Sequence, residues 1–219
     1  MKNEKLRPKV LSTRMIANSS SDLIAKLGVA TNYKSLGLIT SDMDDVTYTA
    51  LDEATKSAQV EVLYAKSMYA GAGNASTLLA GEVIGIIGGQ SPAEVQSGLN
   101  AALKFMENDG YFLSANDDNS IVYYSHLISR TGSYLSKVAG IKEGEPLSYL
   151  IAPPLESIYG LDMALKAADV KLVEFFAPPS ETNFGGGLLT GTQSACKAAC
   201  EAFARAVESV AQNPMEVKI

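Results

Sequence analysis

The pattern of apolar positions predicts strands that alternate with helices along the chain. Short apolar runs rich in Val, Ile and Leu predict strands over 10–17, 36–40, 59–66 and 82–88, and again over 121–129, 147–152, 169–176 and 185–191. Apolar residues at helical spacing predict helices over 50–58, 91–107, 160–168 and 193–211. This order is typical of an α/β fold in which helices pack on mixed sheets.

The same pattern occurs twice. The stretch "LDEATKSAQVEV" at 51–62 returns as "LDMALKAADVKL" at 161–172, with six of the twelve residues identical at an offset of 110. Residues 14–29 likewise align with 126–141 at an offset of 112, and residues 86–103 align with 189–206 at an offset of 103. Because a period near 110 is too long for a solenoid repeat, we expect two domains with separate cores, 1–109 and 110–219.

Charge and composition narrow the possible partners. The 219-residue chain has a net charge of −6 and is 47% hydrophobic, with no basic stripe that could bind nucleic acid or an anionic membrane. The charged first ten residues do not resemble a signal peptide, and no apolar stretch approaches the roughly 20 residues that span a bilayer. The two cysteines fit a reduced compartment. We therefore expect a cytoplasmic protein whose charged partners are cationic.

The stretch "SDMDDVTY" carries the strongest chemical signal. Asp42, Asp44 and Asp45 concentrate negative charge just before a predicted helix. The carboxylates could cap the helix and complement its dipole. They could belong to a calcium loop, although the Gly and the distal Glu of an EF-hand are missing. These residues alone leave both interpretations open.

Signs of catalysis are few. The sequence contains no P-loop, G-x-S-x-G, H-E-x-x-H or dinucleotide fingerprint. His126, the single histidine, lies in an apolar strand, and Cys196 and Cys200 lie in a small, apolar helical stretch. We expect all three side chains to be packed rather than catalytic or metal-binding. The sequence therefore predicts no enzyme, no cofactor and no metal, and a metal-assisted enzyme is only a remote alternative.

Several motifs together resemble a known family. The stretch "GLDMALKAADVKLVEF" followed by "GGGLLTGTQSACKAACEAF" resembles the core of bacterial microcompartment (BMC) shell domains, and the leading strand of each half resembles their circularly permuted form. With "SLGLITSDMDDVTY", "SRTGSYLS" and "YLIAPPLE", essentially the whole chain resembles the ethanolamine-utilisation shell proteins. The resemblance implies two tandem permuted BMC domains of α/β (α+β) class, each a ferredoxin-like mixed or antiparallel sheet with packed helices. It also implies a homotrimeric, pseudohexameric tile that packs edge to edge with other shell proteins around enzymes in the bacterial cytoplasm.

The same resemblance implies an ethanolamine site in small pores within each subunit, between the two domains. The matching positions are Asp44, Asp45, Glu82 and Phe112, with Tyr111 an equal candidate for Phe112. Carboxylates can form charge-assisted hydrogen bonds with the ammonium group, and an aromatic face can contact the cation. Because Gly185 replaces Glu82 in the second copy, we expect the site in one half only.

Two unlike loops, 66–77 and 177–187, are expected to alternate around a gated central pore in such a trimer. The pore residues by resemblance are Tyr69, Ala70, Gly71, Ala72, Gly73, Asn74, Pro178, Ser180, Glu181, Thr182, Asn183, Phe184 and Gly185. An open pore would pass bulky molecules, with cobalamin or nucleotide cofactors as candidates. On the residues alone, both segments could be ordinary surface loops. The alternative function is a soluble regulatory protein of similar form that binds a small amine and does not tile.

Overall fold

The computed structural model describes residues 2–27, 33–68 and 82–215. They form two compact units. Unit 1 comprises Met1–Leu6, Tyr111–Thr131 and Val138–Ile219, and unit 2 comprises Arg7–Gly110 and Gly132–Lys137. Each unit therefore combines most of one half of the sequence with a short segment of the other half.

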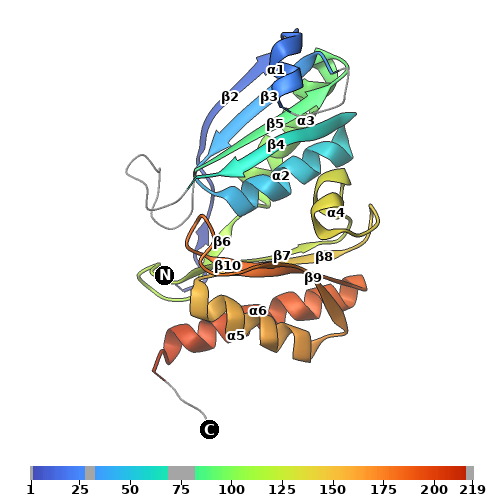
Figure 1. Cartoon of the computed structure of the whole chain (residues 1–219). Helices are drawn as coiled ribbons and strands as arrows, with labels where there is room; N and C mark the ends of the chain where they lie inside the picture. Colours follow the sequence, from blue (N-terminus) through green and yellow to red (C-terminus); the bar gives the residue numbers. More distant parts are fainter. Residues whose placement is uncertain (1, 28–32, 69–81, 216–219) are drawn as a thin grey trace. The chain divides into compact units, whose positions relative to one another are not determined.

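Unit 2 is built on an antiparallel sheet in the order β2-β3-β5-β4 (Figure 1). The strands are β2 (Val10–Ile16), β3 (Ser35–Ser41), β4 (Val60–Ser67) and β5 (Val83–Gly89), and the helices are α1 (Ser21–Lys26), α2 (Asp44–Ser57) and α3 (Pro92–Asn108). A Cβ atom on Gly37 would lie 2.8 Å from Val95 of α3, and one on Gly85 would lie 2.7 Å from Leu51 of α2. These glycines therefore let both helices pack closely on the sheet.

Unit 1 contains an antiparallel sheet in the order β1-β6-β7-β8-β10-β9. Its strands are β1 (Lys5–Leu6), β6 (Phe112–Ser114), β7 (Val122–Ile128), β8 (Leu147–Ala152), β9 (Val170–Phe176) and β10 (Gly185–Gly191). Helices α5 (Pro154–Ala167) and α6 (Gln193–Gln212) cover this sheet (Figure 1). Leu150, Leu189 and Phe203 lie at the centre of the core between them. Helix α4 (Ser133–Ala139) begins in unit 2 and ends in unit 1.

The predicted fold class is confirmed, and the eight predicted strands lie within two residues of their predicted bounds. Two predicted helix starts are wrong, because α2 begins at Asp44 rather than at 50 and α5 begins at Pro154 rather than at 160. The first turns of α2 bury polar residues such as Asp44, Asp45 and Thr47. Because helices are predicted from apolar residues at helical spacing, a first turn made of polar residues is not recognised as helical. The short strands β1 and β6 were not predicted.

Candidate functional site

The predicted carboxylates of unit 2 come from segments that meet at one end of its sheet. The strand register places Ser41 of β3 and Ser67 of β4 opposite Val83 of β5. Glu82 precedes Val83, and its carbonyl oxygen accepts a hydrogen bond of 2.7 Å from the Met68 N–H. Since α2 begins three residues after Ser41, its first turn starts at this end of the sheet.

Asp44 and Asp45 are buried there, with exposed fractions of 4% and 5%. One carboxylate oxygen of Asp44 accepts the Asp45 N–H at 2.9 Å, and the side chains of Ser67 and Asp45 also hydrogen-bond to Asp44. Burial raises the pKa of Asp44 to about 6, because the loss of hydration outweighs these hydrogen bonds. Asp44 is therefore a buried carboxyl group that gives up its proton less readily than an exposed aspartate does.

Two neighbours of this pair, Tyr48 and Ser67, were not predicted, and neither was Tyr134 beside Tyr48. The Tyr48 side chain hydrogen-bonds to Ser67, and its ring centroid lies 6.4 Å from that of Tyr134. Burial, with the nearby Asp44, Tyr134 and Asp45, raises the pKa of Tyr48, so its hydroxyl remains a donor. Tyr48 lies one helical turn after Asp44, a spacing that could have signalled it from sequence. Ser67 is placed by strand register, which the sequence pattern does not give.

The three aspartates occupy different positions relative to helix α2. Met43 is the N-cap of α2 and makes no side-chain cap hydrogen bond, whereas Asp44 and Asp45 occupy the first turn, where a negative charge complements the helix dipole. Asp42 lies before the helix, and its carboxylate accepts the Lys9 N–H at 2.7 Å. Within the described residues, no group of three or more His, Cys, Asp or Glu side chains could hold a metal ion.

Phe112 belongs to unit 1, where it is 1% exposed. Its ring centroid lies 5.4 Å from that of Tyr124 and 6.0 Å from that of Phe184. Its neighbour Tyr111 lies under the Lys5 ammonium, which is 4.3 Å from the ring centroid. Phe112 is therefore an aromatic residue of the core of unit 1, and its predicted contact with ethanolamine stays a prediction.

The second predicted pore loop is held by its own backbone. The Ser180 N–H donates to the Phe184 carbonyl at 2.8 Å, and the Asn183 N–H donates to the Ser180 carbonyl at 3.1 Å. The predicted strand that follows this loop is confirmed, because Gly185–Gly191 forms β10 and is paired on both sides. Gly186 has a φ of 155°, and a Cβ there would lie 1.9 Å from the Leu150 carbonyl oxygen. The predicted pore residues 69–74 lie outside the described residues.

The single histidine and the two cysteines are packed, as predicted. The His126 ring is stacked on Tyr124 with centroids 5.4 Å apart. Cys196 and Cys200 are both buried as free thiols on α6. Burial raises the pKa of both thiols, that of Cys200 to about 11, so both are protonated and unreactive at neutral pH.

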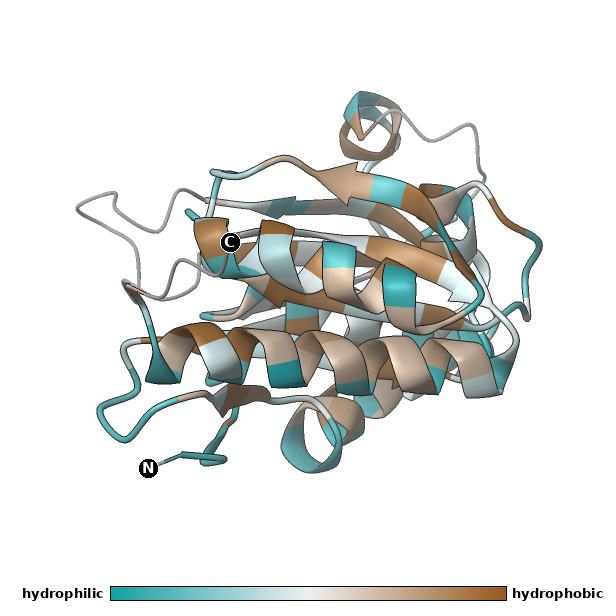
Figure 2. Cartoon of the chain, turned by 90° about the horizontal axis from the view of Figure 1, so that it is seen from below, coloured by the Kyte–Doolittle hydropathy of each residue, from teal (hydrophilic) through white to brown (hydrophobic). Residues whose placement is uncertain are grey.

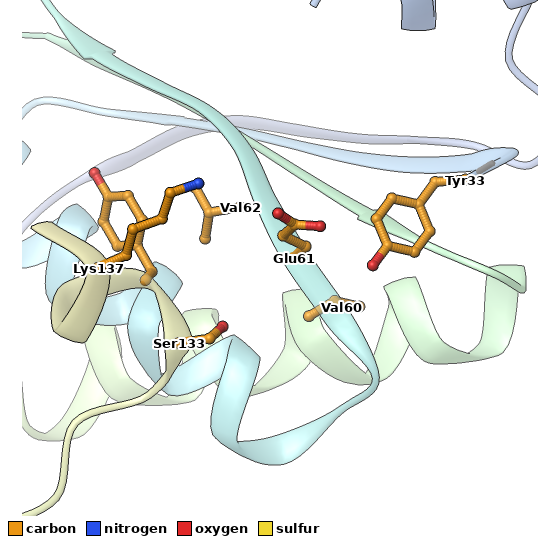
Figure 3. A pocket seen from close by; sticks show the side chains of 7 residues that line it. Tyr33, Val60, Glu61, Val62, Ser133 and Lys137 are labelled. Atoms are coloured by element: carbon orange, nitrogen blue, oxygen red, sulfur yellow. The ribbon is translucent and has the colours of Figure 1, made fainter. Parts of the chain in front are cut away.

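Unit 2 also contains a pocket of about 300 Å³ beside the outer strand β4, lined by Tyr33, Val60, Glu61, Val62, Ser133, Tyr134 and Lys137. Figure 3 shows the Tyr33 and Glu61 side chains pointing toward each other, with Lys137 on the other side of the pocket. The Tyr33 hydroxyl hydrogen-bonds to Glu61, and burial raises the pKa of that hydroxyl. The predicted ligand residues do not line this pocket.

Comparison with known proteins decides the family. Residues 35–119 match the BMC domain. The chain is 68% identical over 215 residues to the bacterial microcompartment shell protein EutL of Clostridium perfringens, which covers 98% of this chain and 99% of that protein. The chain belongs to the EutL family of bacterial microcompartment shell proteins. The EutL protein of Escherichia coli K12 is 51% identical over 96% of both chains.

Solved EutL structures share the fold. The ethanolamine utilization protein EutL from Leptotrichia buccalis is 64% identical, with a TM-score of 0.95 over 99% of this chain and all of that chain. The trimeric shell protein PduB, at 21% identity, has a TM-score of 0.76 over 93% of this chain and 89% of that chain. The predicted resemblance is confirmed. Like other members of the EutL family, this chain is a structural component of a microcompartment shell and not an enzyme. Among its described helices, none is long and apolar enough to cross a bilayer.

Proposed function

We propose that this shell protein forms a homotrimeric, pseudohexameric tile and that each subunit binds ethanolamine at Asp44, Asp45 and Glu82. The observation that carries the ligand proposal is the buried Asp44–Asp45 pair, which hydrogen-bonds to Ser67 at one end of the sheet of unit 2. A buried carboxylate is costly unless it is protonated or meets a cation. A small ammonium ion supplies that charge and can donate several hydrogen bonds.

The hydroxyl of the ligand has candidate partners at the same site. Ser67 and the Tyr48 hydroxyl are bonded to each other, and Ser67 also bonds to Asp44. This network can exchange one of its internal hydrogen bonds for a bond to a ligand hydroxyl. A site that pairs with both the ammonium and the hydroxyl of its ligand discriminates against analogues that lack either group. Such an analogue would leave a buried polar group of the site unpaired.

Isothermal titration calorimetry with ethanolamine, propylamine and ethylene glycol tests the ligand proposal. We expect ethanolamine to bind, propylamine to bind roughly tenfold more weakly through loss of one buried hydrogen bond, and ethylene glycol to show no measurable binding. Asp45→Asn and Glu82→Gln should each weaken ethanolamine binding at least tenfold. Asp42→Asn is the matched control, because its carboxylate is bonded to the Lys9 backbone. Equal affinity for all three compounds would refute the site.

The proposed central pore is the finer part of the function. In a trimer, the loop that contains Ser180 and Asn183 would alternate with the loop that contains residues 69–74, and the two sets of loops would gate the opening for cofactors such as cobalamin or nucleotides. The internal hydrogen bonds of the second loop support its role as a fixed element of the pore. Equilibrium dialysis with cobalamin and with a nucleotide tests this role. Absence of binding, together with impermeability of tile sheets to both, would refute it.

A further inference from the structure

The pocket beside β4 is separate from the proposed ethanolamine site. It is lined by Val60, Glu61 and Val62 at the start of this strand, whereas Ser67, which bonds to Asp44, is at the end of the strand. At about 3.3 Å per residue, the strand carries Ser67 about 15 Å away from Val62. All the residues that line the pocket belong to unit 2. This cavity therefore needs an interpretation of its own.

The wall of the pocket that α4 provides is held in place by buried hydrogen bonds. The N–H groups of Gly132 and Leu135 each donate to the Asp52 carboxylate at 2.8 Å. Asp52 is fully buried, and Leu135 is 2% exposed. These bonds hold segment 132–137 on α2, so the helix turn that carries Lys137 has a fixed position beside β4. The pocket is therefore largely preformed, as ligand sites usually are.

Two side chains of opposite charge line this cavity. Figure 3 shows the Glu61 carboxylate turned toward the Tyr33 hydroxyl, with Lys137 on the other side of the pocket. Burial, together with the charge of Glu61, raises the pKa of the Tyr33 hydroxyl, which therefore remains a donor to Glu61. Within the part of the chain that the structure describes, neither Glu61 nor Lys137 forms a salt bridge. The two charges thus share one cavity without a direct ion pair.

This arrangement of charges selects one class of ligand. Lys137 repels a simple cation and Glu61 repels a simple anion, whereas a zwitterion satisfies both. The volume of about 300 Å³ is at the lower end of the range for ligand pockets, which suits a molecule of few non-hydrogen atoms. Val60 and Val62 offer apolar contacts to a short aliphatic chain. We propose that the pocket binds a small amino acid, whose ammonium group pairs with Glu61 and whose carboxylate pairs with Lys137.

Each end of such a ligand has support from a neighbouring hydroxyl. Ser133 lines the pocket one helical turn before Lys137, so its hydroxyl and the Lys137 ammonium lie on the same side of α4 and can both bond to a carboxylate. The Tyr33 hydroxyl bonds to Glu61 and so orients the carboxylate that receives the ligand ammonium. The inference goes beyond the proposed ethanolamine site and shares no binding residue with it.

Isothermal titration calorimetry with β-alanine, propylamine and propionate tests the inference. Propylamine keeps only the ammonium group of β-alanine, and propionate keeps only its carboxylate. Ethanolamine is present at saturation throughout, so that the added amines do not report on the Asp44 site. We expect β-alanine to bind at least about tenfold more tightly than either analogue, because each analogue lacks one charge-assisted hydrogen bond. Failure of β-alanine to bind, or binding no tighter than that of the analogues, would overturn the inference.

Variants assign the binding to this pocket. Glu61→Gln and Lys137→Gln should each weaken β-alanine binding at least about tenfold, whereas Lys137→Arg keeps the charge and should retain binding. Lys197→Gln is the matched control, because it changes the net charge as Lys137→Gln does. Lys197 is an exposed residue of α6 in unit 1, and Figure 2 shows hydrophilic positions along this helix. Unchanged β-alanine binding in Glu61→Gln or in Lys137→Gln would place the ligand elsewhere and overturn the assignment.

Discussion

Two carboxylates of the same helix differ in what surrounds them. Asp52 accepts two backbone N–H groups and lies 3.5 Å from the Lys56 ammonium, so its charge is compensated within the fold. Asp44 is also buried, but the hydrogen bonds that favour its ionised form come from neutral or acidic groups, and its pKa rises to about 6. A buried group with a perturbed pKa is a candidate for binding a ligand, whereas a fully compensated one is structural. Asp52 therefore holds the segment 132–137, whereas Asp44 is the carboxylate of this helix that we propose binds a ligand.

The raised pKa of Asp44 predicts how pH acts on stability and on binding. Its pKa in the folded state, about 6, lies above the usual 3.8, so the native fold favours the protonated form and stability falls as pH rises from about 4 to 6. Ethanolamine binding should change in the opposite direction, because its ammonium group pairs with the ionised carboxylate. We expect affinity to rise by up to about tenfold per unit below pH 6 and to level off above about pH 7.

Calorimetric titrations of ethanolamine from pH 5 to pH 8 measure how the affinity changes with pH. The variant Asp44→Asn should remove most of this pH dependence, whatever its effect on affinity at pH 8. The variant Asp42→Asn should preserve the pH dependence. A pH dependence that survives in Asp44→Asn would assign the titration to another group.

At the scale of elements, the contact between α2 and segment 132–137 depends on one side chain. Asp52→Ala would leave the buried N–H groups of Gly132 and Leu135 without their acceptor, at a cost of about 1–3 kcal/mol each. We therefore expect the free energy of unfolding to fall by about 2–5 kcal/mol. Urea unfolding followed by circular dichroism at one protein concentration measures the loss. Glu201→Ala removes an exposed helix carboxylate 4.0 Å from Arg205 and should cost less than about 0.5 kcal/mol. Equal losses would show that Asp52 does not hold the segment.

The contact between α2 and segment 132–137 also shows which features the sequence could predict and which it could not. Periodicity located the strands, because strands depend on local apolar spacing, and identical residues at a fixed offset located the repeat. Asp52 and Asp162 occupy matching positions in stretches that share six of twelve residues, yet one is buried and the other exposed. The difference depends on which segment covers each helix, and local spacing does not record it. The same reason explains the candidate site, where the Asp44 and Asp45 cluster was visible in the sequence but the Ser67 contact required the strand register.

At the scale of the whole molecule, the negative net charge favours binding of the proposed cationic ligand and opposes packing of one tile against another. Each chain carries a formal charge of −6, so the surface of a shell attracts small cations such as ethanolamine. The same charge makes neighbouring tiles repel one another. Screening shortens this repulsion from about 30 Å at 0.01 M salt to about 8 Å at 0.15 M salt. Salt should therefore promote packing between tiles and should affect burial of apolar surface within the proposed trimer much less.

Negative-stain electron microscopy and sedimentation of the purified chain at 0.01 M and 0.15 M salt test whether salt acts differently on the packing between tiles and on the trimer. We expect three-fold particles at both salt concentrations, because burial of apolar surface between the subunits of the proposed trimer depends little on ionic strength. Edge-to-edge hexagonal sheets should be more extensive at 0.15 M salt, where the charge of −6 on each chain is better screened. Discrete particles that form no sheets at any salt concentration would contradict the proposed edge-to-edge packing of tiles.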